Sequence, residues 1–257
     1  NLKRLCEKAE IDLEIVKPDT RQFNELTRAF VLAGVPNLAM PQDNVYFASI
    51  YKFMKINKIT TFLSGSNFAL ECILQQGNTH DAYDLRNIKD INRRFGREKI
   101  DRLPLISNLQ RDIDAFILGI KTIRPLNYIN YNRERAIKEL NEFCGFEYYG
   151  SKHLENTLTK FIQLYWLPKK FNVDKRTSHL SSMIVSGQIT REEALKILDK
   201  PLYDEEEMQK DIDFILKSLD LSRQEFEQIM KEPPKQHSNY HTSFYNMIRK
   251  MLLSIIR

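Results

Sequence analysis

Glycine is scarce, cysteines are few and long apolar runs are absent from this sequence of 257 residues. Eight glycines are about half the usual share of roughly 7%, which favours helices over many short strands joined by tight turns. The longest uncharged apolar runs, such as residues 251–256, are far shorter than the roughly 20 residues of a membrane-spanning helix. Three widely spaced cysteines fit neither a disulfide framework nor a zinc knuckle. We therefore expect a helix-rich cytoplasmic protein without a transmembrane segment.

Signatures of several enzyme classes are missing too. No histidine pair has zinc-ligand spacing, and neither the Gly-x-Ser-x-Gly turn of serine hydrolases nor the Gly-x-Gly-x-x-Gly turn of Rossmann folds occurs. Of the net charge of +5, the segment from Pro234 onward carries +4 and the rest only +1. A nearly neutral body argues against a protein that holds nucleic acid on a wide basic face, although a local cluster can still bind a nucleotide.

The first 150 residues alternate between predicted strands and helices. Residues 11–16 are a β-branched run that predicts a strand, and Asp19 with Gln22 at capping spacing predicts a helix start behind it. The remaining elements predicted here are a helix over residues 45–54, a strand over 59–63, an edge strand over 122–129 and a helix over 132–144. Strands separated by helices imply a parallel sheet, which binds ligands at the carboxyl ends of its strands.

Beyond residue 150 the strand signal ends. Three pairs at capping-box spacing head apolar-periodic segments: Thr190 with Glu193, Asp204 with Glu207, and Ser222 with Glu225. We therefore predict an α/β fold, with a parallel-sheet domain over residues 1–150, a helical subdomain over 151–257 and a linker-like stretch at 232–241. The subdomain ends in an amphipathic helix, which we expect to pack on its own domain, with a partner protein as the second choice and an anionic membrane surface as the third.

Three stretches carry side chains suited to chemistry. The first follows the strand over residues 59–63 and comprises Ser64, Gly65, Ser66, Asn67 and Glu71. Gly65 lets the backbone approach a ligand, the N–H groups of the next helix start can bind a phosphate, and Glu71 can hold Mg²⁺. Without other signals, the same residues are typical of an ordinary capped turn.

The second stretch is Lys152, His153, Glu155 and Lys160, and the third is Asp174, Lys175 and Arg176, followed by His179. Lys152 at a helix start opposes the macrodipole, which a bound anion such as pyrophosphate would explain; charge pairing along the helix is an equally good interpretation. The third stretch is more typical of a solvated salt-bridge cluster than of a site. His179 alone is more typical of a packed or capping histidine than of a base.

Taken together, these stretches resemble the N-acetyl sugar amidotransferases of surface-polysaccharide and nonulosonate biosynthesis, which are PP-loop ATP pyrophosphatases. The resemblance covers residues 1 to about 235; each motif alone is weak, but together and in this order they are specific. The similar segments are residues 62–71, 83–89, 94–96, 125–129, 149–155, 167–171, 174–176, 179–181 and 186–195.

The resemblance implies a partial PP-loop domain of the adenine nucleotide alpha hydrolase type that uses ATP and Mg²⁺. Such an enzyme activates an acetamido group of a sugar, free or nucleotide-linked, so that ammonia from a glutaminase subunit replaces the oxygen and gives an acetamidino group; a homo-oligomer is an option. Carried over by motif, the nucleotide-side residues are Ser64, Gly65, Ser66 and Asn67, Glu71 is the Mg²⁺ ligand, and Lys152 meets pyrophosphate. The residues on the sugar or phosphate side are His153, Glu155, Asp174, Lys175 and Arg176.

One departure from that family is large, because its phosphate loop, Ser-Gly-Gly-x-Asp-Ser, does not occur in these residues. Since the chain opens at Asn1 without a methionine, we expect a fragment whose loop lies upstream. Two other functions stay open: a non-catalytic scaffold that keeps the fold without the loop, and a PP-loop enzyme that modifies tRNA. The nearly neutral body speaks against tRNA.

Overall fold

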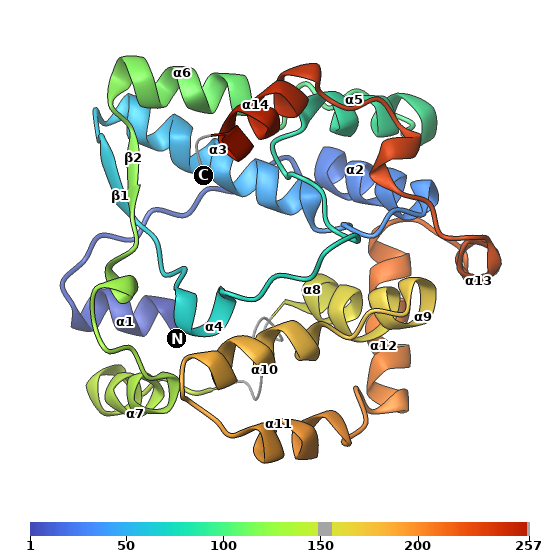
Figure 1. Cartoon of the computed structure of the whole chain (residues 1–257). Coiled ribbons are helices and arrows are strands. Elements are labelled where there is room, and N and C mark those ends of the chain that lie inside the picture. Colours follow the sequence, from blue (N-terminus) through green and yellow to red (C-terminus); the bar gives the residue numbers. More distant parts are fainter. Residues whose placement is uncertain (149–155, 256–257) are drawn as a thin grey trace.

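The computed structural model describes residues 1–148 and 156–255, which form many helices and, at one side of the molecule, a small parallel sheet (Figure 1). The N-terminal elements are α1 (Leu2–Lys8), α2 (Thr20–Ala33), α3 (Met40–Ile56), β1 (Thr61–Leu63), α4 (Phe68–Glu71), α5 (Leu85–Phe95), α6 (Asn108–Leu118), β2 (Lys121–Ile123), the 3₁₀ turn η1 (Pro125–Asn127) and α7 (Arg133–Cys144). The C-terminal elements are α8 (Thr157–Phe161), the π-helical turn η2 (Ile162–Trp166), α9 (Leu167–Phe171), α10 (Lys175–Val185), α11 (Arg191–Leu198), α12 (Glu205–Ser218), α13 (Arg223–Lys231), the 3₁₀ turn η3 (His237–Asn239) and α14 (Phe244–Ile255).

The predicted helix starts are confirmed where a side chain caps the backbone locally. The Asp19 carboxylate accepts the N–H of Gln22 at the start of α2. Thr190 and Ser222 each form a complete capping box at the starts of α11 and α13. The Asn132 side-chain oxygen accepts the N–H of Arg135 at the start of α7. These bonds form between residues three positions apart, so they require no knowledge of tertiary structure.

The strand predicted over residues 11–16 is wrong. This segment has no strand assignment, and the side chains of Ile11, Ile15 and Val16 are exposed. A β-branched run becomes a strand only where a neighbour pairs with its backbone, and β1 and β2 pair with each other instead. The other two strand predictions are confirmed over shorter spans, because Pro125 turns the chain soon after β2.

The sheet places two chain segments at one edge. β1 and β2 run parallel, with Thr61 opposite Lys121 and Leu63 opposite Ile123. Helix α3 covers one face, where Phe62 packs against the buried cluster that includes Tyr51. Because the strands are parallel, the residues that follow them leave from the same edge, and the Ser64 N–H still donates to the Ile123 carbonyl at 2.8 Å.

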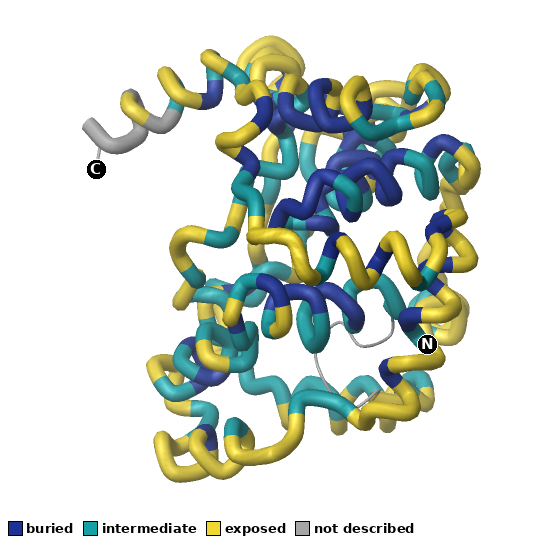
Figure 2. The backbone as a smooth tube through the Cα atoms, turned by 90° about the vertical axis from the view of Figure 1, so that its right-hand side faces the viewer, coloured by how far each residue is buried: buried dark blue, intermediate teal, exposed yellow. Residues whose placement is uncertain are grey.

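The largest buried cluster contains residues from both sides of residue 150. Phe30 of α2, Ile88 of α5, Trp166 of η2 and Phe226 of α13 all belong to it. The indole Nε1 of Trp166 also donates to the carbonyl of Val35 at 3.0 Å. The core therefore continues from the N-terminal helices into the C-terminal ones (Figure 2).

The prediction of a linker over residues 232–241 is wrong. His237 and Tyr240 are buried in this segment, and the Tyr240 hydroxyl donates to the Ala33 carbonyl at 2.7 Å. The buried Lys170 ammonium donates to the Ile229 and Glu232 carbonyls, which fixes the beginning of the segment. Two adjacent prolines and few apolar residues suggested a linker, but two large side chains are enough to attach a short segment to a core.

His237 is the centre of a buried polar network. The Asn87 amide nitrogen donates to the carbonyl of His237, so its oxygen accepts the proton on His237 Nδ1 at 2.7 Å. The His237 ring stacks on His80 with centroids 4.6 Å apart, and His80 pairs with Asp84. Burial, followed by the nearby His80, lowers the pKa of His237 from 6.5 to about 3, so the ring is neutral in the folded protein.

This neutral histidine predicts a loss of stability in acid. Below pH 6.5 His237 binds a proton in the unfolded chain, whereas in the folded chain it stays neutral down to about pH 3. The free energy of unfolding therefore falls by up to about 1.4 kcal/mol for each unit by which the pH is lowered within this window. Burial raises the pKa of Asp43 to about 6, which acts with the opposite sign below pH 6. Urea unfolding of wild type and His237→Gln from pH 7 to pH 4 separates the contribution of His237 from that of Asp43. The difference in free energy of unfolding between the two proteins should shrink as the pH falls. A constant difference would contradict a neutral buried ring.

Candidate functional site

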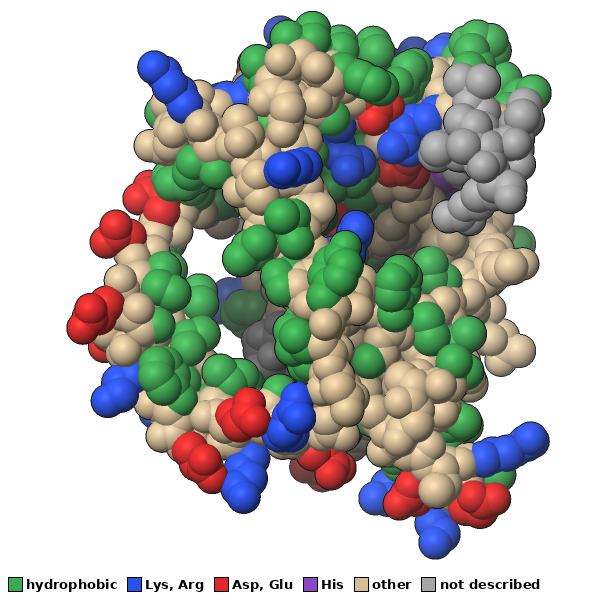
Figure 3. Space-filling view, turned by 60° about the vertical axis from the view of Figure 1, so that its left-hand side comes forward, with side chains coloured by type: hydrophobic (Ala, Val, Ile, Leu, Met, Phe, Trp, Pro, Cys, Tyr) green, Lys and Arg blue, Asp and Glu red, His purple; other side chains and the backbone are tan. Residues whose placement is uncertain are grey.

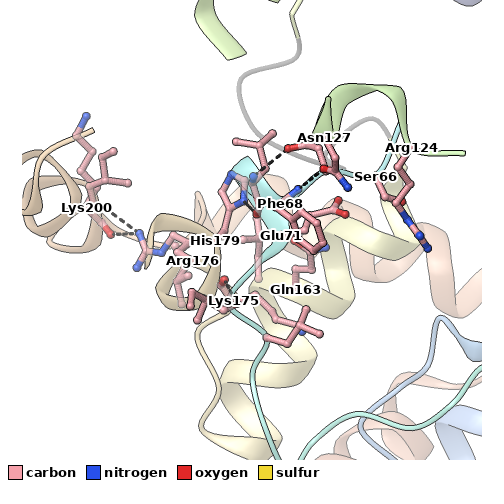
Figure 4. A pocket seen from close by; sticks show the side chains of 18 of the residues that line it. Ser66, Phe68, Glu71, Arg124, Asn127, Gln163, Lys175, Arg176, His179 and Lys200 are labelled. Carbon is pink, nitrogen blue, oxygen red and sulfur yellow. Dashed lines mark hydrogen bonds between the residues drawn. The ribbon is translucent and has the colours of Figure 1, made fainter. Parts of the chain in front are cut away.

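A cavity of about 960 Å³ lies at the carboxyl edge of the sheet (Figure 4). Four segments line it: the turn after β1 with α4 and its following loop, the turn after β2, the π-helical turn η2, and α10 with the loop after α11. The polar lining residues are Ser66, Asn67, Glu71, Arg124, Asn127, Gln163, Lys175, Arg176, Ser178, His179 and Lys200. The cavity therefore brings together the first and third stretches that the sequence singles out.

Side chains shape the turn after β1. The Ser64 and Ser66 hydroxyls are 2.9 Å apart, and the Asn67 oxygen accepts the Leu70 N–H at 3.0 Å. Asn127 reaches across from the turn after β2 and accepts the Phe68 N–H at 2.9 Å. The N–H groups of Phe68 and Leu70 are thus paired within the protein. The positive charge that the cavity offers comes from side chains instead.

Gly65 sits in this turn beside open space. A Cβ built on it would meet no atom within 4 Å, and its φ lies outside the left-handed region. We therefore expect Gly65→Ala to change the free energy of unfolding by less than about 1 kcal/mol. If a nucleotide approaches the backbone here, Gly65→Val should weaken ATP binding at least about tenfold at unchanged stability. Thermal unfolding and isothermal titration with ATP measure the two effects; equal ATP affinity in Gly65→Val and wild type would show that no ligand uses this space.

Helix α4 is held against α10. Leu70 packs in a buried cluster with Met183, and His179 Nδ1 donates to the Leu70 carbonyl at 3.2 Å. The Ser182 hydroxyl accepts the Ile73 N–H at 2.9 Å. His179 thus helps to link two backbone segments, which agrees with the interpretation of it as a packed or capping residue. These contacts place Glu71 on the same cavity as the beginning of α10.

Asp174 and Arg176 hold the far wall of the cavity. The Asp174 carboxylate caps α10 by accepting the Arg176 N–H, and it also receives the Arg176 guanidinium, with a shortest contact of 2.8 Å. The remaining guanidinium N–H groups donate to the carbonyls of Ile197, Leu198 and Lys200 at the end of α11. All five donors of this side chain are therefore used inside the protein. Arg176 positions the loop that carries Lys200.

The π-helical turn aims Gln163 at the cavity. The Leu167 N–H bonds to the Ile162 carbonyl five residues earlier, so this turn contains one residue more than an α-helical turn allows. Because of that wider turn, Trp166 and Leu167 stay on the buried side with Phe161 and Ile162, while Gln163 and Leu164 line the cavity. Pro168 explains the π-helical turn, because it has no N–H to donate to a carbonyl of the preceding turn and its ring disfavours α-helical geometry at that carbonyl.

The lining is positively charged overall. The cationic lining residues are Arg124, Lys175, Arg176 and Lys200, and Glu71 contributes one carboxylate. The charge of Arg176 is paired with Asp174, which leaves three cations for this comparison. In Figure 4, Lys200 and Arg124 lie at opposite ends of the cavity, so the cations are spread along it. Burial raises the pKa of the nearby Tyr131, and the charge of Glu71 adds to the effect. A cavity of this kind suits an elongated anion.

The sequence-predicted residues are distributed unevenly around the cavity. Those that line it are Ser66, Asn67, Glu71, Lys175 and Arg176; Ser64, Gly65 and Asp174 are their chain neighbours. Lys152, His153 and Glu155 lie outside the described residues. Lining residues to which the sequence analysis gave no role are Arg124, Asn127, Gln163 and Lys200, although Asn127 lies in the similar segment 125–129 and Gln163 lies on the helix that follows the second stretch. Arg124 and Asn127 could have been found from their position just after the second parallel strand, and Gln163 from the nearby Pro168. No sequence signal marks Lys200.

Comparison with known protein families finds a match for part of the chain. Residues 155–252 match the family model for the LPS biosynthesis protein WbpG-like, C-terminal domain. This match supports a role in lipopolysaccharide biosynthesis. It includes the walls of the cavity that η2, α10 and the loop after α11 provide, whereas the turns after β1 and β2 lie before it. No curated protein matches the chain. Among the described residues, no helix is both long enough and apolar enough to span a membrane.

Proposed function

We propose that this chain is the synthase part of an ATP-dependent amidotransferase that converts an acetamido group of a sugar into an acetamidino group. The observation that supports it most is the shared cavity, which joins the Ser64–Asn67 turn and Glu71 with the beginning of α10. These are two separate motifs of the amidotransferase resemblance. The family match of residues 155–252 agrees with the setting in lipopolysaccharide biosynthesis.

The described residues fit ATP and Mg²⁺. The space beside Gly65 admits a ligand close to the backbone, and the cations along the cavity suit a triphosphate. Mg²⁺ is usually held by one or two carboxylates together with the phosphates of its substrate, and Glu71 offers one carboxylate. Within residues 1–148 and 156–255 there is no group of three metal-ligating side chains, so the phosphates would supply further ligands. We propose that the phosphate loop lies in sequence outside these 257 residues and completes a PP-loop domain.

The chemistry explains why such residues are needed. An amide oxygen is a very poor leaving group; transfer of AMP to that oxygen releases pyrophosphate, and ammonia then displaces AMP together with the oxygen. Lys175 and Arg124 would stabilise the negative charge that develops on the departing pyrophosphate. The Gln163 carboxamide can donate an N–H to the acetamido oxygen and accept the acetamido N–H with its own oxygen. Both bonds together would orient the acetamido group. Leu164 and Leu202 provide apolar surface that limits access of water.

Ammonia would come from a separate glutaminase subunit. Free ammonium at high concentration should therefore replace glutamine. The test is an incubation of the protein carrying the phosphate loop with ATP, ammonium and a panel of acetamido sugars, free and nucleotide-linked. We expect AMP, pyrophosphate and a sugar lighter by the difference between an oxygen and an imino group. ATP binding without turnover on any sugar would favour a scaffold, and salt-sensitive binding of tRNA would favour a tRNA-modifying enzyme.

A further inference from the structure

Helix α14 is attached to the body through its polar side. It contacts α6, and the Tyr245 hydroxyl donates to the Asp112 carboxylate at 2.6 Å. Arg249 Nε donates to the same carboxylate at 2.9 Å. Asn246 is buried and accepts the side-chain N–H of Asn108 at 3.1 Å. Positions 245, 246 and 249 lie on one side of a helix, so this side faces α6.

The apolar side chains that the structure describes on α14 point to solvent. Phe244, Met247, Ile248 and Met251 are 61%, 51%, 38% and 60% exposed, respectively. Their spacing of three and four residues places them together, roughly opposite the side that contacts α6. An amphipathic helix on a globular domain normally turns its apolar side inward. For these four residues the orientation is reversed, which contradicts the expectation that this part of the helix packs its apolar face on its own domain. The expected face also included residues 252, 255 and 256, whose side chains lie outside the described ones.

Shape and charge indicate what covers this face. Figure 2 shows α14 running out from the edge of the body. The segment from Pro234 onward contains four basic residues and no acidic one. Two of them are paired within the protein, Arg249 with Asp112 and Lys235 with Glu232. The net positive charge that the sequence places at this end of the chain would repel a second copy and is complemented by anionic lipid headgroups.

We propose that α14 binds an anionic membrane surface, with the side chains of Phe244, Met247, Ile248 and Met251 entering the boundary between headgroups and acyl chains. The contacts of Tyr245, Asn246 and Arg249 with α6 then hold the body at the membrane. The helix lies on the bilayer and does not cross it. This inference is independent of the proposed catalytic function, because none of these residues lines the cavity.

Co-sedimentation with lipid vesicles tests the proposal. Wild type should bind vesicles of phosphatidylcholine containing about 30% phosphatidylglycerol, bind pure phosphatidylcholine weakly, and dissociate as salt is raised. The double variant Met247→Glu, Ile248→Glu should bind at least about tenfold less. The matched control is Val185→Glu, Phe214→Glu, which adds the same charge at exposed apolar positions on α10 and α12 and should bind as wild type does.

Two results would overturn the proposal. One is wild type that stays in the supernatant with anionic vesicles, or that binds equally well when Met247 and Ile248 are replaced. The other is a dimer in sedimentation velocity without lipid that the same double variant abolishes, because a second copy would then cover this face. Since all four substituted side chains are partly or largely exposed, circular dichroism should show unchanged folding in both double variants.

Discussion

Replacing Glu71 by glutamine, in a protein that includes the proposed phosphate loop, is expected to reduce pyrophosphate release by about a thousandfold or more while the unfolding transition stays where it is. Glu71 lines the cavity at the end of α4. The glutamine has the same size but lacks the negative charge that Mg²⁺ requires of a carboxylate ligand. The effect should therefore appear in turnover and not in folding.

A pyrophosphate-coupled assay across a Mg²⁺ titration measures this. Glu192→Gln on α11 is the matched control, since it removes the same charge outside the cavity lining and should leave turnover unchanged. Full activity of Glu71→Gln would remove Glu71 from the metal site. A lowered melting temperature would show that its carboxylate supports the fold instead.

The second large effect is expected on stability. Arg176→Ala should lower the free energy of unfolding by about 2–3 kcal/mol, because it removes a guanidinium that bonds to the Asp174 carboxylate and to three carbonyls at the end of α11. The pair is about a quarter exposed, so solvent screening keeps the loss below that of a fully buried pair.

Its chain neighbour provides the comparison. Lys175→Ala should cost about 1 kcal/mol or less in stability, yet it should reduce ATP-dependent turnover, because Lys175 is among the cations that line the cavity. Urea unfolding and steady-state kinetics on both variants separate the two roles. Arg176→Ala with the stability of wild type, or Lys175→Ala with the greater stability loss, would reverse these assignments.

The sequence predicts helix starts well, because the interactions that decide them are local. The capping residues Asp19, Thr190 and Ser222 bond to backbone three positions away, and the helices start where they predict. The strand prediction for residues 11–16 is wrong because a strand depends on a partner elsewhere in the chain. The linker prediction for residues 232–241 is wrong for the same reason, since the hydrogen bond between Tyr240 and Ala33 spans most of the sequence.

The candidate site shows the same division. A turn after a strand pointed to residues 64–67, and the parallel pairing of β1 with β2 places this turn at the cavity. The pattern Asp174-Lys175-Arg176 cannot reveal that the Arg176 guanidinium is fully engaged within the protein, because the carbonyls that bond to it come from the end of another helix. Gln163 depends on a π-helical turn, for which Pro168 was the sole local sign.

The most direct test of the proposed chemistry follows the acetamido oxygen itself. The substrate identified from the panel of sugars is prepared with oxygen-18 in its acetamido carbonyl, and the nucleotide products are analysed by mass spectrometry after turnover with ATP and ammonium. Activation through AMP transfer predicts that AMP carries the label and that the sugar product has lost it. Label retained in the sugar, or found in inorganic phosphate released with ADP, would contradict the account.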